Sequence, residues 1–457
     1  MLATGLVAID ATILATAVPS VVDDLGGFAQ FPWLFSIYLL AQAVSTPIFG
    51  KLSDVYGRRP MMLVGIGLFL LGSILCGVAW GMPALIVFRA LQGLGAGAVQ
   101  PIAMTIVGDL YSVAERAKVQ GYVASVWGIS SVVGPTLGGV FSDFLSWRWI
   151  FFVNIPVGAL AAIMLVRHYS ETVESRKRSI DVTGAILLAL GSSLVILGLL
   201  EGGVLWSWLS APSVVVLGAG GALLVGFGLV ERRAREPILP GWVLTHRVLA
   251  STNLTSLAVG AVLIGLTSYI PLYVQGVLGT SALVAGFALA AMTLGWPLAA
   301  SQAGRLYLRV GFQVTAGIGA LFVLAGAGLL LLIGPGTGVA QVAATCFVLG
   351  LGMGLIASPT LVAAQAVVDR GSRGVVTGTN MFARSMGSAV GIAVFGAIAN
   401  HRLGTTVGSH GGTANDVPAN LLDPAVHDVF LAAGVVAVLM TVAITSIPRR
   451  IELMNQG

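Results

Sequence analysis

Long apolar runs separated by short polar segments make up almost the whole chain. A run of about 20 mostly apolar residues is long enough to cross the hydrocarbon core of a bilayer as a helix. Because lipid offers the backbone no hydrogen bonds, such runs are expected to be helical, which predicts an all-α polytopic membrane protein. The pattern predicts fourteen spans, near residues 2–22, 33–50, 62–80, 84–107, 118–140, 149–166, 181–200, 213–230, 250–274, 282–301, 313–333, 340–366, 376–399 and 427–447.

The composition excludes the other broad classes of protein. Apolar residues make up 57% of the 457 and charged residues only 9%, whereas a soluble domain carries roughly 25% charged residues. The apolar content excludes disorder, and two cysteines exclude a disulfide scaffold, so Cys76 and Cys346 are expected as buried small side chains. The 61 glycines suit helices that pack closely in a bilayer. No charged region precedes the first span, so a cleaved signal peptide is not expected.

Basic residues are distributed unequally between the two sets of alternating loops. All but four of the 23 lysines and arginines lie in one set; Arg148 and Arg402 lie in the other, and Arg89 and Arg384 lie within spans. Basic loops face the cytoplasm, so we expect a multi-pass protein of the cytoplasmic membrane with both termini inside. The net charge of +5 then reflects orientation in the membrane, and the basic residues are too dispersed to indicate nucleic acid.

Two glycine patterns recur at nearly the same separation along the chain. Residues 50–57 and 304–311 both read Gly, basic, Leu, four residues, Gly, at an offset of 254, and residues 93–97 and 350–354 alternate glycine at an offset of 257. Matching positions in two halves predict parallel six-helix repeats, which is a transporter architecture. The expected organisation is an N-terminal half at 1–170, two inserted helices with their linkers at 171–247, and a C-terminal half at 248–457.

Three charged residues lie inside the predicted spans, where a charge is costly and is therefore a functional candidate. Asp10 can take a proton from outside and release it inside, or pair with a cationic substrate; the alternative is a structural role in which a neutral Asp10 is hydrogen-bonded to Thr12 or to a neighbouring helix. Arg89 either faces a central cavity, with Gln92 on the same helical face, or extends to the interface. We expect Asp10 and Arg89 to form a proton-coupling site, and Arg384 lies in the thirteenth span.

A cluster of charges occupies the basic turn between the second and third spans. Gly50 and Gly57 permit close backbone approach and unusual φ angles, and they frame Asp54, Arg58 and Arg59. A carboxylate here can pair with an arginine or cap a helix N-terminus. We expect a conformational lock that forms on the cytoplasmic side in one state and breaks in another; simple anchoring of a basic loop is the alternative.

Four segments of the chain resemble motifs of the major facilitator superfamily, and most closely its 14-helix drug:proton antiporter branch. Segment 50–60 is similar to the superfamily's motif between helices 2 and 3, and segment 89–95 to its helix-4 motif with a membrane-embedded arginine. Segment 128–139 is similar to the helix-5 motif typical of antiporters, and segment 147–156 to the start of helix 6 in the 14-helix branch. The resemblance covers nearly the whole chain and implies the major facilitator fold.

The resemblance also bears on single residues. Asp109, at the cytoplasmic end of the fourth span, is implied as a partner of the arginines in the lock, with Arg116 close by. Asp10 matches the helix-1 motif of the branch, but Ala15 stands where the branch usually has Asn, which is expected to alter substrate or proton handling.

Further site residues are expected on the fifth span and on the core spans. A proline and four glycines break the fifth helix locally and form a small-residue face, which fits a hinge or gasket between the halves, or packing alone; they are Gly128, Gly134, Pro135, Gly138 and Gly139. Residues expected to line a substrate cavity are Tyr38, Gln42, Gln100, Trp127, Tyr269, Tyr273, Gln275, Trp296, Gln365, Asn380 and Arg384.

These features predict proton-coupled export of lipophilic, cationic small molecules by alternating access, with export of a lipid or an endogenous metabolite as the alternative. No phosphate-binding loop is present, so the proton gradient rather than ATP is expected to supply the energy. We expect neither a cofactor nor a metal nor enzymatic activity, because no cluster of His, Asp or Cys lies near one interface. The expected state is a monomer in the lipid bilayer, with a small-molecule or lipid-like substrate as its partner.

Overall fold

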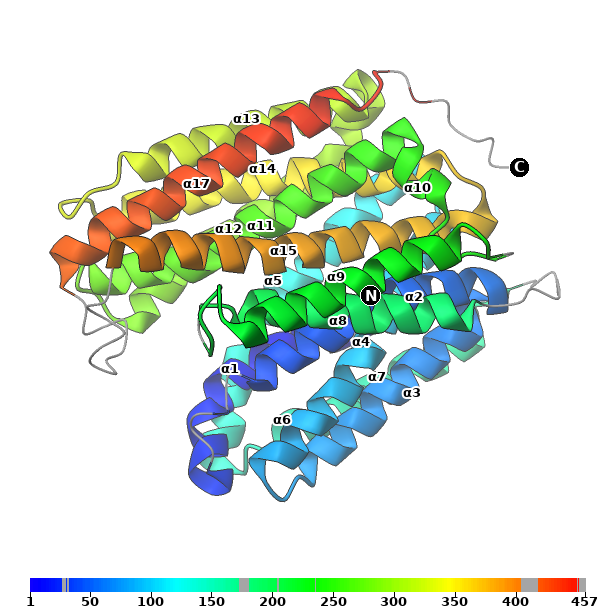
Figure 1. Ribbon diagram of the computed structural model, residues 1–457, viewed down its shortest axis with the longest axis horizontal. Helices are drawn as coiled ribbons and strands as arrows, with labels where there is room; N and C mark the ends of the chain where they lie inside the picture. Colours follow the sequence, from blue (N-terminus) through cyan, green and yellow to red (C-terminus); the bar gives the residue numbers. More distant parts are fainter. Residues whose placement is uncertain are drawn as a thin grey trace.

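In the computed structural model the chain folds into long helices that run side by side in a bundle (Figure 1). The structure describes all residues except 27–29, 31–32, 172–180, 204, 235, 404–417, 450 and 452–457. The helices are α1 (Leu2–Leu25), α2 (Trp33–Tyr56), α3 (Arg58–Gly77), α4 (Met82–Leu110), α5 (Val113–Phe144), α6 (Trp149–Phe152), α7 (Asn154–His168), α8 (Val182–Glu201), α9 (Ala211–Glu231), α10 (Gly241–Thr245), α11 (Arg247–Gly276), α12 (Ala282–Val310), α13 (Phe312–Leu331), α14 (Val339–Ala366), η2 (Arg370–Ser372), α15 (Arg373–Leu403) and α17 (Ala419–Thr445).

The predicted number of membrane spans is recovered in the described helices. Thirteen of them are long and apolar enough to cross a membrane, and α1, which bends by 64° between Leu14 and Thr16, makes fourteen. The short α6 and α7 together form one of these spans, from Trp149 to His168. The all-α, 14-span fold is therefore confirmed, and each predicted apolar run corresponds to one span.

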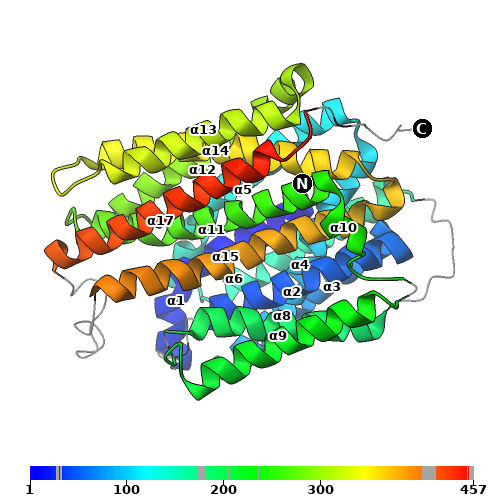
Figure 2. The same ribbon diagram turned by 45° about the horizontal axis from the view of Figure 1, so that its top comes forward.

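Two groups of helices pack among themselves, and an inserted pair lies beside them. Helices α1 to α7 form the N-terminal half and helices α11 to α17 the C-terminal half; the halves meet along α2–α15 and α5–α12. Helices α8 and α9 lie together at the edge of the bundle (Figure 2). Val44 of α2, Ile196 of α8 and Ala389 of α15 are buried in one cluster, so α8 packs against the seam between the halves. The residue boundaries predicted for the three segments stay a prediction.

The glycine repeat has the same structural role in both halves. Gly57, between α2 and α3, has a φ of +96°, and Gly311, between α12 and α13, has a φ of +88°. Such angles favour glycine, because a Cβ would clash with the backbone. Gly95 of α4 packs directly on α3, and Gly352 of α14 packs in the same way on α13. The repeated pattern thus marks repeated turns and repeated close helix contacts.

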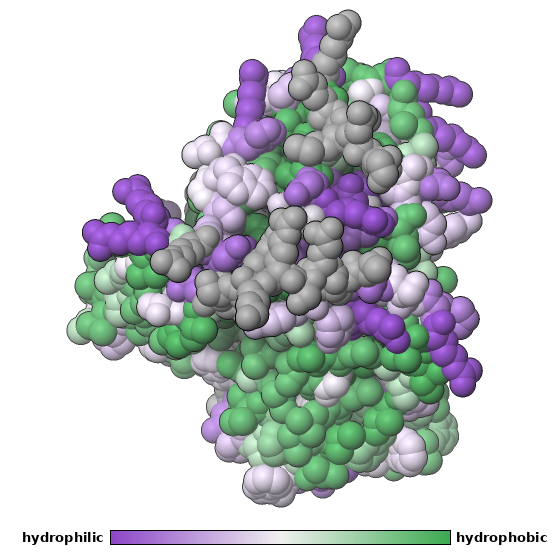
Figure 3. Space-filling model, turned by 90° about the vertical axis from the view of Figure 1, so that its right-hand side faces the viewer, coloured by the Kyte–Doolittle hydropathy of each residue, from purple (hydrophilic) through white to green (hydrophobic). Residues whose placement is uncertain are grey.

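The turns that carry most of the described basic residues lie at one end of the bundle, called the basic end below. Figure 3 looks onto this end, where hydrophilic side chains gather beside the apolar sides of the helices. The opposite end, called the far end, carries the α3–α4 and α5–α6 turns, with Arg148. Cys76 and Cys346 are both buried and free, as predicted.

Candidate transport sites

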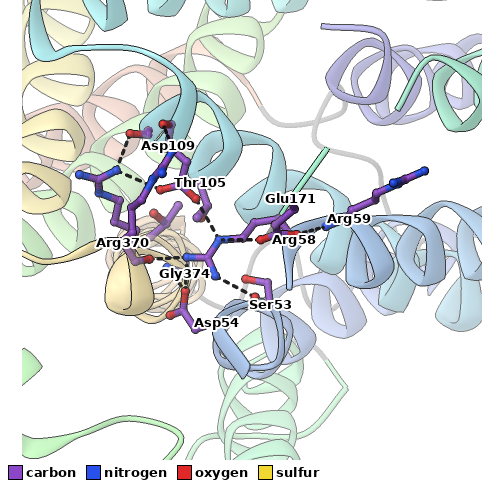
Figure 4. A network of polar contacts seen from close by, with 12 residues as sticks. Ser53, Asp54, Arg58, Arg59, Thr105, Asp109, Glu171, Arg370 and Gly374 are labelled. Carbon is purple, nitrogen blue, oxygen red and sulfur yellow. Dashed lines mark hydrogen bonds and ion pairs between the residues drawn. The ribbon is translucent and has the colours of Figure 1, made fainter. Parts of the chain in front are cut away.

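Asp54 links the two halves at the basic end (Figure 4). Its carboxylate accepts hydrogen bonds from the backbone N–H groups of Gly374, at 2.9 Å, and Val375, at 2.7 Å, in the first turn of α15. It also forms an ion pair with Arg58 at 2.6 Å, and its side chain is only 1% exposed. A carboxylate that faces both a helix N-terminus and an arginine is held by charge-assisted bonds. This contact therefore fastens α2 to α15.

Asp109, near the end of α4, makes a second link between the halves (Figure 4). One carboxylate oxygen lies 3.0 Å from Nε of Arg58, and the other lies 3.0 Å from Nη1 of Arg373. Arg370 donates a hydrogen bond to the backbone carbonyl of Asp109 at 2.7 Å. Acidic and basic groups thus alternate across the interface, and Asp109 contacts the motif's arginine, as the resemblance implies.

Arg116 does not join this network, contrary to the prediction. Its guanidinium donates to backbone carbonyls at the end of α4, including that of Tyr111 at 2.9 Å. Within the described part of the chain it forms no ion pair with Asp109, whose second partner is Arg373 instead. Arg370 and Arg373, which both come from the segment that begins α15, were not predicted as site residues.

A rim of polar groups after α7 covers the outside of the network. Glu171 accepts a hydrogen bond from the backbone N–H of Arg59 at 2.9 Å and lies 4.0 Å from Arg58. Arg59 therefore lies at the edge of the predicted lock rather than within it. Burial, with Glu171 close by, raises the pKa of Tyr169 to about 12, so this hydroxyl stays neutral and adds no charge to the rim.

Glycine allows α2 and α15 to touch beside the lock. A Cβ at Gly50 would lie 2.5 Å from the carbonyl oxygen of Gly374, closer than real side chains come. Gly378, one turn further along α15, packs against the same stretch of α2. The predicted close approach at Gly50 is therefore observed, and Gly57 supplies the positive φ after it.

The second candidate site is a buried polar cluster in the N-terminal half. Arg89 donates to one carboxylate oxygen of Asp10 at 2.8 Å, and Gln92 donates to the other at 2.7 Å. Both charged residues are 1% exposed, so Arg89 does not extend to the interface. Its guanidinium lies over the ring of Tyr38, 4.1 Å from the centroid. Thr12 donates to backbone carbonyls rather than to Asp10.

Asn154 and Ser73 complete this cluster; neither was predicted as a site residue, although Asn154 lies in the motif at 147–156. Asn154 donates to Asp10 at 3.0 Å and to Ser73 at 3.2 Å, and Gln92 donates to Ser73 at 2.7 Å. Asn154 begins α7 directly after the break from α6, which places its side chain inside the bundle. The signal in the sequence was a single Asn within an apolar span. The carboxylate of Asp10 thus has three side-chain donors, from α4 and α7.

Arg384 differs from Arg89 because it has no acidic partner among the described residues. Its Nε is buried and donates to none of them. On the same helix, Asn380 lies one turn earlier and holds α15 to α11 through Ser256 at 2.8 Å. Arg384 therefore adds an unbalanced positive charge within the bundle, whereas the charges of Arg89 and Asp10 offset each other.

The helix-5 motif packs mainly within the N-terminal half. Gly134 and Gly138 lie directly against α1, and the carbonyl of Pro135 accepts a hydrogen bond from α1 at 3.2 Å. Only Gly128 approaches α12, at an ordinary contact distance of 3.5 Å, and Gly139 faces open space. Among these residues a contact between the halves is thus made by Gly128, whereas Gly134 and Gly138 make a tight α1–α5 contact, which is the packing alternative.

A cavity of about 360 Å³ lies near the far end, between α8, α11 and α15. Leu200, Trp208, Tyr269 and Gly396 are among its lining residues. Tyr269 is the one residue predicted for a substrate cavity that lines it. The others lie elsewhere, in helix contacts or on exposed faces: Tyr38, Gln42, Gln100, Trp127, Tyr273, Gln275, Trp296, Gln365, Asn380 and Arg384.

Fourteen spans in two repeated halves, joined at one end by a charged network, define a polytopic membrane transporter fold. The family model of the Major Facilitator Superfamily matches residues 1–392, and the chain belongs to this superfamily.

Named relatives agree with this assignment. Multidrug resistance protein 3 of Bacillus subtilis (strain 168) is 38% identical over 395 residues, which cover 86% of this chain and 76% of that protein. The multidrug transporter protein MdtP of the same organism is 36% identical over 417 residues, which cover 88% and 76%. A crystal structure of the human organic anion transporter MFSD10 shares the fold, with a TM-score of 0.68, 15% identity and 97% of each chain covered.

Proposed function

We propose that this protein exports lipophilic small molecules, including cations, across the cytoplasmic membrane in exchange for protons. The observation that carries the proposal is the buried ion pair between Asp10 and Arg89 within the spans. A charged pair at this depth is costly to keep and is therefore a candidate for function rather than for stability. The relatives named as multidrug transporters support the same activity for this chain.

The surroundings of Asp10 support the proposed proton coupling. A proton on this carboxylate removes the charge that attracts Arg89, at 2.8 Å, and turns one acceptor oxygen into a donor. The contact between α1 and α4 then weakens, and Gln92 and Asn154 must rearrange. A cationic compound competes with the proton for the same carboxylate, so one charge serves both.

The network at the basic end supports the proposed alternating access. Among the described residues, the hydrogen bonds between the halves all lie towards this end, including those of Asp54, Asp109 and Tyr307. We assign this arrangement to the state closed to the cytoplasm, with both termini on the cytoplasmic side. Opening to the cytoplasm then requires α15 to leave Asp54 and Asp109.

Everted membrane vesicles from a pump-deficient host test the proposal, with tetraphenylphosphonium, ethidium and acriflavine as a panel of lipophilic cations. A proton gradient is expected to drive uptake of at least one of them by the wild type, and collapse of the gradient is expected to stop it. Asp10→Asn is expected to abolish gradient-driven uptake but to retain exchange of the compound down its own gradient.

Asp24→Asn is the matched control, because it breaks an exposed ion pair with Arg148 at the far end. It is expected to transport like the wild type. Gradient-driven uptake that persists in Asp10→Asn would refute the role of this carboxylate. A wild type that moves none of the panel would refute export of lipophilic cations.

Export of a lipid or an endogenous metabolite is the second candidate function. The apolar cavity beside α8 favours it, because such a cavity at membrane depth can hold an alkyl chain. Lipid profiling of a deletion strain distinguishes the two functions: accumulation of one lipid class supports the second, and an unchanged profile with lost resistance to the panel supports the first.

A further inference from the structure

The cavity beside the inserted helices lies outside both charged sites, and neither of them uses it. Its volume of about 360 Å³ falls within the ~300–1,000 Å³ typical of pockets for drug-sized ligands. The end of α8 forms one wall, with Leu200, and the loop after α8 contributes Trp208. Tyr269 of α11 and Phe395 of α15 lie opposite. The cavity is separate from the Asp10 cluster, which belongs to the other half.

The lining favours an apolar, aromatic ligand. Aliphatic and aromatic side chains predominate, and Ser268 and Tyr269 contribute the hydroxyl groups. None of the described residues that line it is charged. Because no charged side chain among these residues would hold an ion and apolar side chains predominate, a ring system with one hydrogen-bonding group matches the cavity better than an ion does.

A glycine turn places the aromatic wall. Gly203 follows α8 with a φ of +78°, and its N–H donates to the carbonyl of Trp206 at 2.7 Å. The chain folds back, and the ring of Trp208 lies over the backbone of Gly202, where a Cβ would come within 2.6 Å of it. The inserted pair thus carries a local structure that supplies the tryptophan to the cavity.

We propose that this cavity binds the apolar ring system of the exported compound, and that α8 and its following loop are part of the substrate site. The inference rests on the export function proposed above and narrows it to lipophilic aromatic compounds. It gives the inserted pair a direct role in binding. The Asp10 cluster binds the proton or the positive charge of the compound, and this cavity binds its apolar ring system.

Gly396 allows a direct test, because it lines the cavity and a Cβ there would meet no atom within 4 Å. Gly396→Leu therefore fills the cavity without moving the backbone. Gly328 of α13 is also free of neighbours within 4 Å but faces outward, so Gly328→Leu is the matched control. For tetraphenylphosphonium, Gly396→Leu is expected to raise the half-saturating concentration about tenfold, and the control is expected to leave it unchanged.

A binding measurement separates this inference from the export function. Ser268 is exposed and lines the cavity, whereas Cys76 and Cys346 are buried, so a maleimide will label the reconstituted Ser268→Cys variant at one place. Tetraphenylphosphonium is expected to slow this labelling but not that of Leu332→Cys, an exposed position at the end of α13.

Labelling and transport together distinguish failure of the site from failure of export. If tetraphenylphosphonium protects Ser268→Cys from labelling and this protection is lost when Gly396→Leu is added, the site is supported. This holds even if transport is absent, and absent transport would refute the export function. Labelling that tetraphenylphosphonium does not slow overturns the site, whatever the transport measurement gives. Unchanged half-saturation in Gly396→Leu also overturns it.

Discussion

Replacing Asp54 with Asn tests whether the charged network holds the basic end closed. The change removes the ion pair with Arg58 at 2.6 Å and weakens the two bonds from the first turn of α15. Breaking a buried ion pair by removing one charge costs about 3–5 kcal/mol. Even ~3 kcal/mol changes an equilibrium roughly 150-fold, so a closed form that exceeds the open form by about 100 to 1 would drop to a near-even mixture.

Spin labels at exposed positions, one in each half, measure this shift. Tyr56→Cys and Val310→Cys place them at the basic end, and both native side chains there are exposed. The parent protein is expected to give one short distance, and Asp54→Asn a second, longer one of similar weight. Asp24→Asn breaks a pair in which Asp24 is 46% exposed, worth ~0–1 kcal/mol, and is expected to change nothing. A single unchanged distance in Asp54→Asn would show that closure does not depend on this carboxylate.

Three further predictions concern Arg89, Arg373 and Asn154. Arg89→Gln leaves a buried carboxylate without its cation and is expected to cost about 3–5 kcal/mol of stability. The melting temperature of the purified protein is therefore expected to fall strongly. Arg384→Gln breaks no ion pair with a described residue and is expected to cost far less. Arg373→Gln is expected to lengthen the spin-label distance, and Arg116→Gln is not, because only Arg373 bonds an acid across the halves; equal effects would contradict the network described. Asn154→Leu removes one of the three side-chain donors to the Asp10 carboxylate and is expected to cost about 1–3 kcal/mol, seen as a lower melting temperature of the purified protein; an unchanged melting temperature would count against this bond.

The features that could be predicted are those for which a local alternative would cost much free energy. Spans follow from the length of apolar runs, and the φ of +96° at Gly57 follows from a glycine that ends a charged turn. Asp10 and Arg89 stood out because a charge within a span needs a partner, and the structure pairs them. Asn154 and Ser73 did not stand out, because neutral polar side chains are cheaper to bury than charges and their role depends on which helices meet.

Arg116 was expected to join the network at Asp109, but Arg373 takes that place, and the internal repeat gives a physical reason. Arg116 and Arg373 are 257 residues apart, which is one repeat, and they begin the equivalent helices α5 and α15. Nearness in the sequence favoured Arg116, but its guanidinium bonds to backbone carbonyls of its own half, whereas Arg373 bonds to Gly108 and Asp109 of the other half. The position that corresponds to Asp109 in the C-terminal half is Ala366. Arg116 therefore meets no acid there and bonds to backbone carbonyls instead.

The same asymmetry appears at the turn that follows each repeat's second helix. The counterpart of Asp54, 254 residues later, is Leu308, and the contact to the other half is made by the neighbouring Tyr307, whose hydroxyl donates to the carbonyl of Val113 at 2.7 Å. A neutral bond of this kind contributes about 0.5–1.5 kcal/mol, much less than a buried ion pair costs to break. A motion that opens the basic end must therefore break charge-assisted bonds between α2 and α15. Between α5 and α12 it must break only packing contacts and one neutral hydrogen bond. In the proposed closed state, the contact between the halves thus depends mainly on the two carboxylates of the N-terminal half.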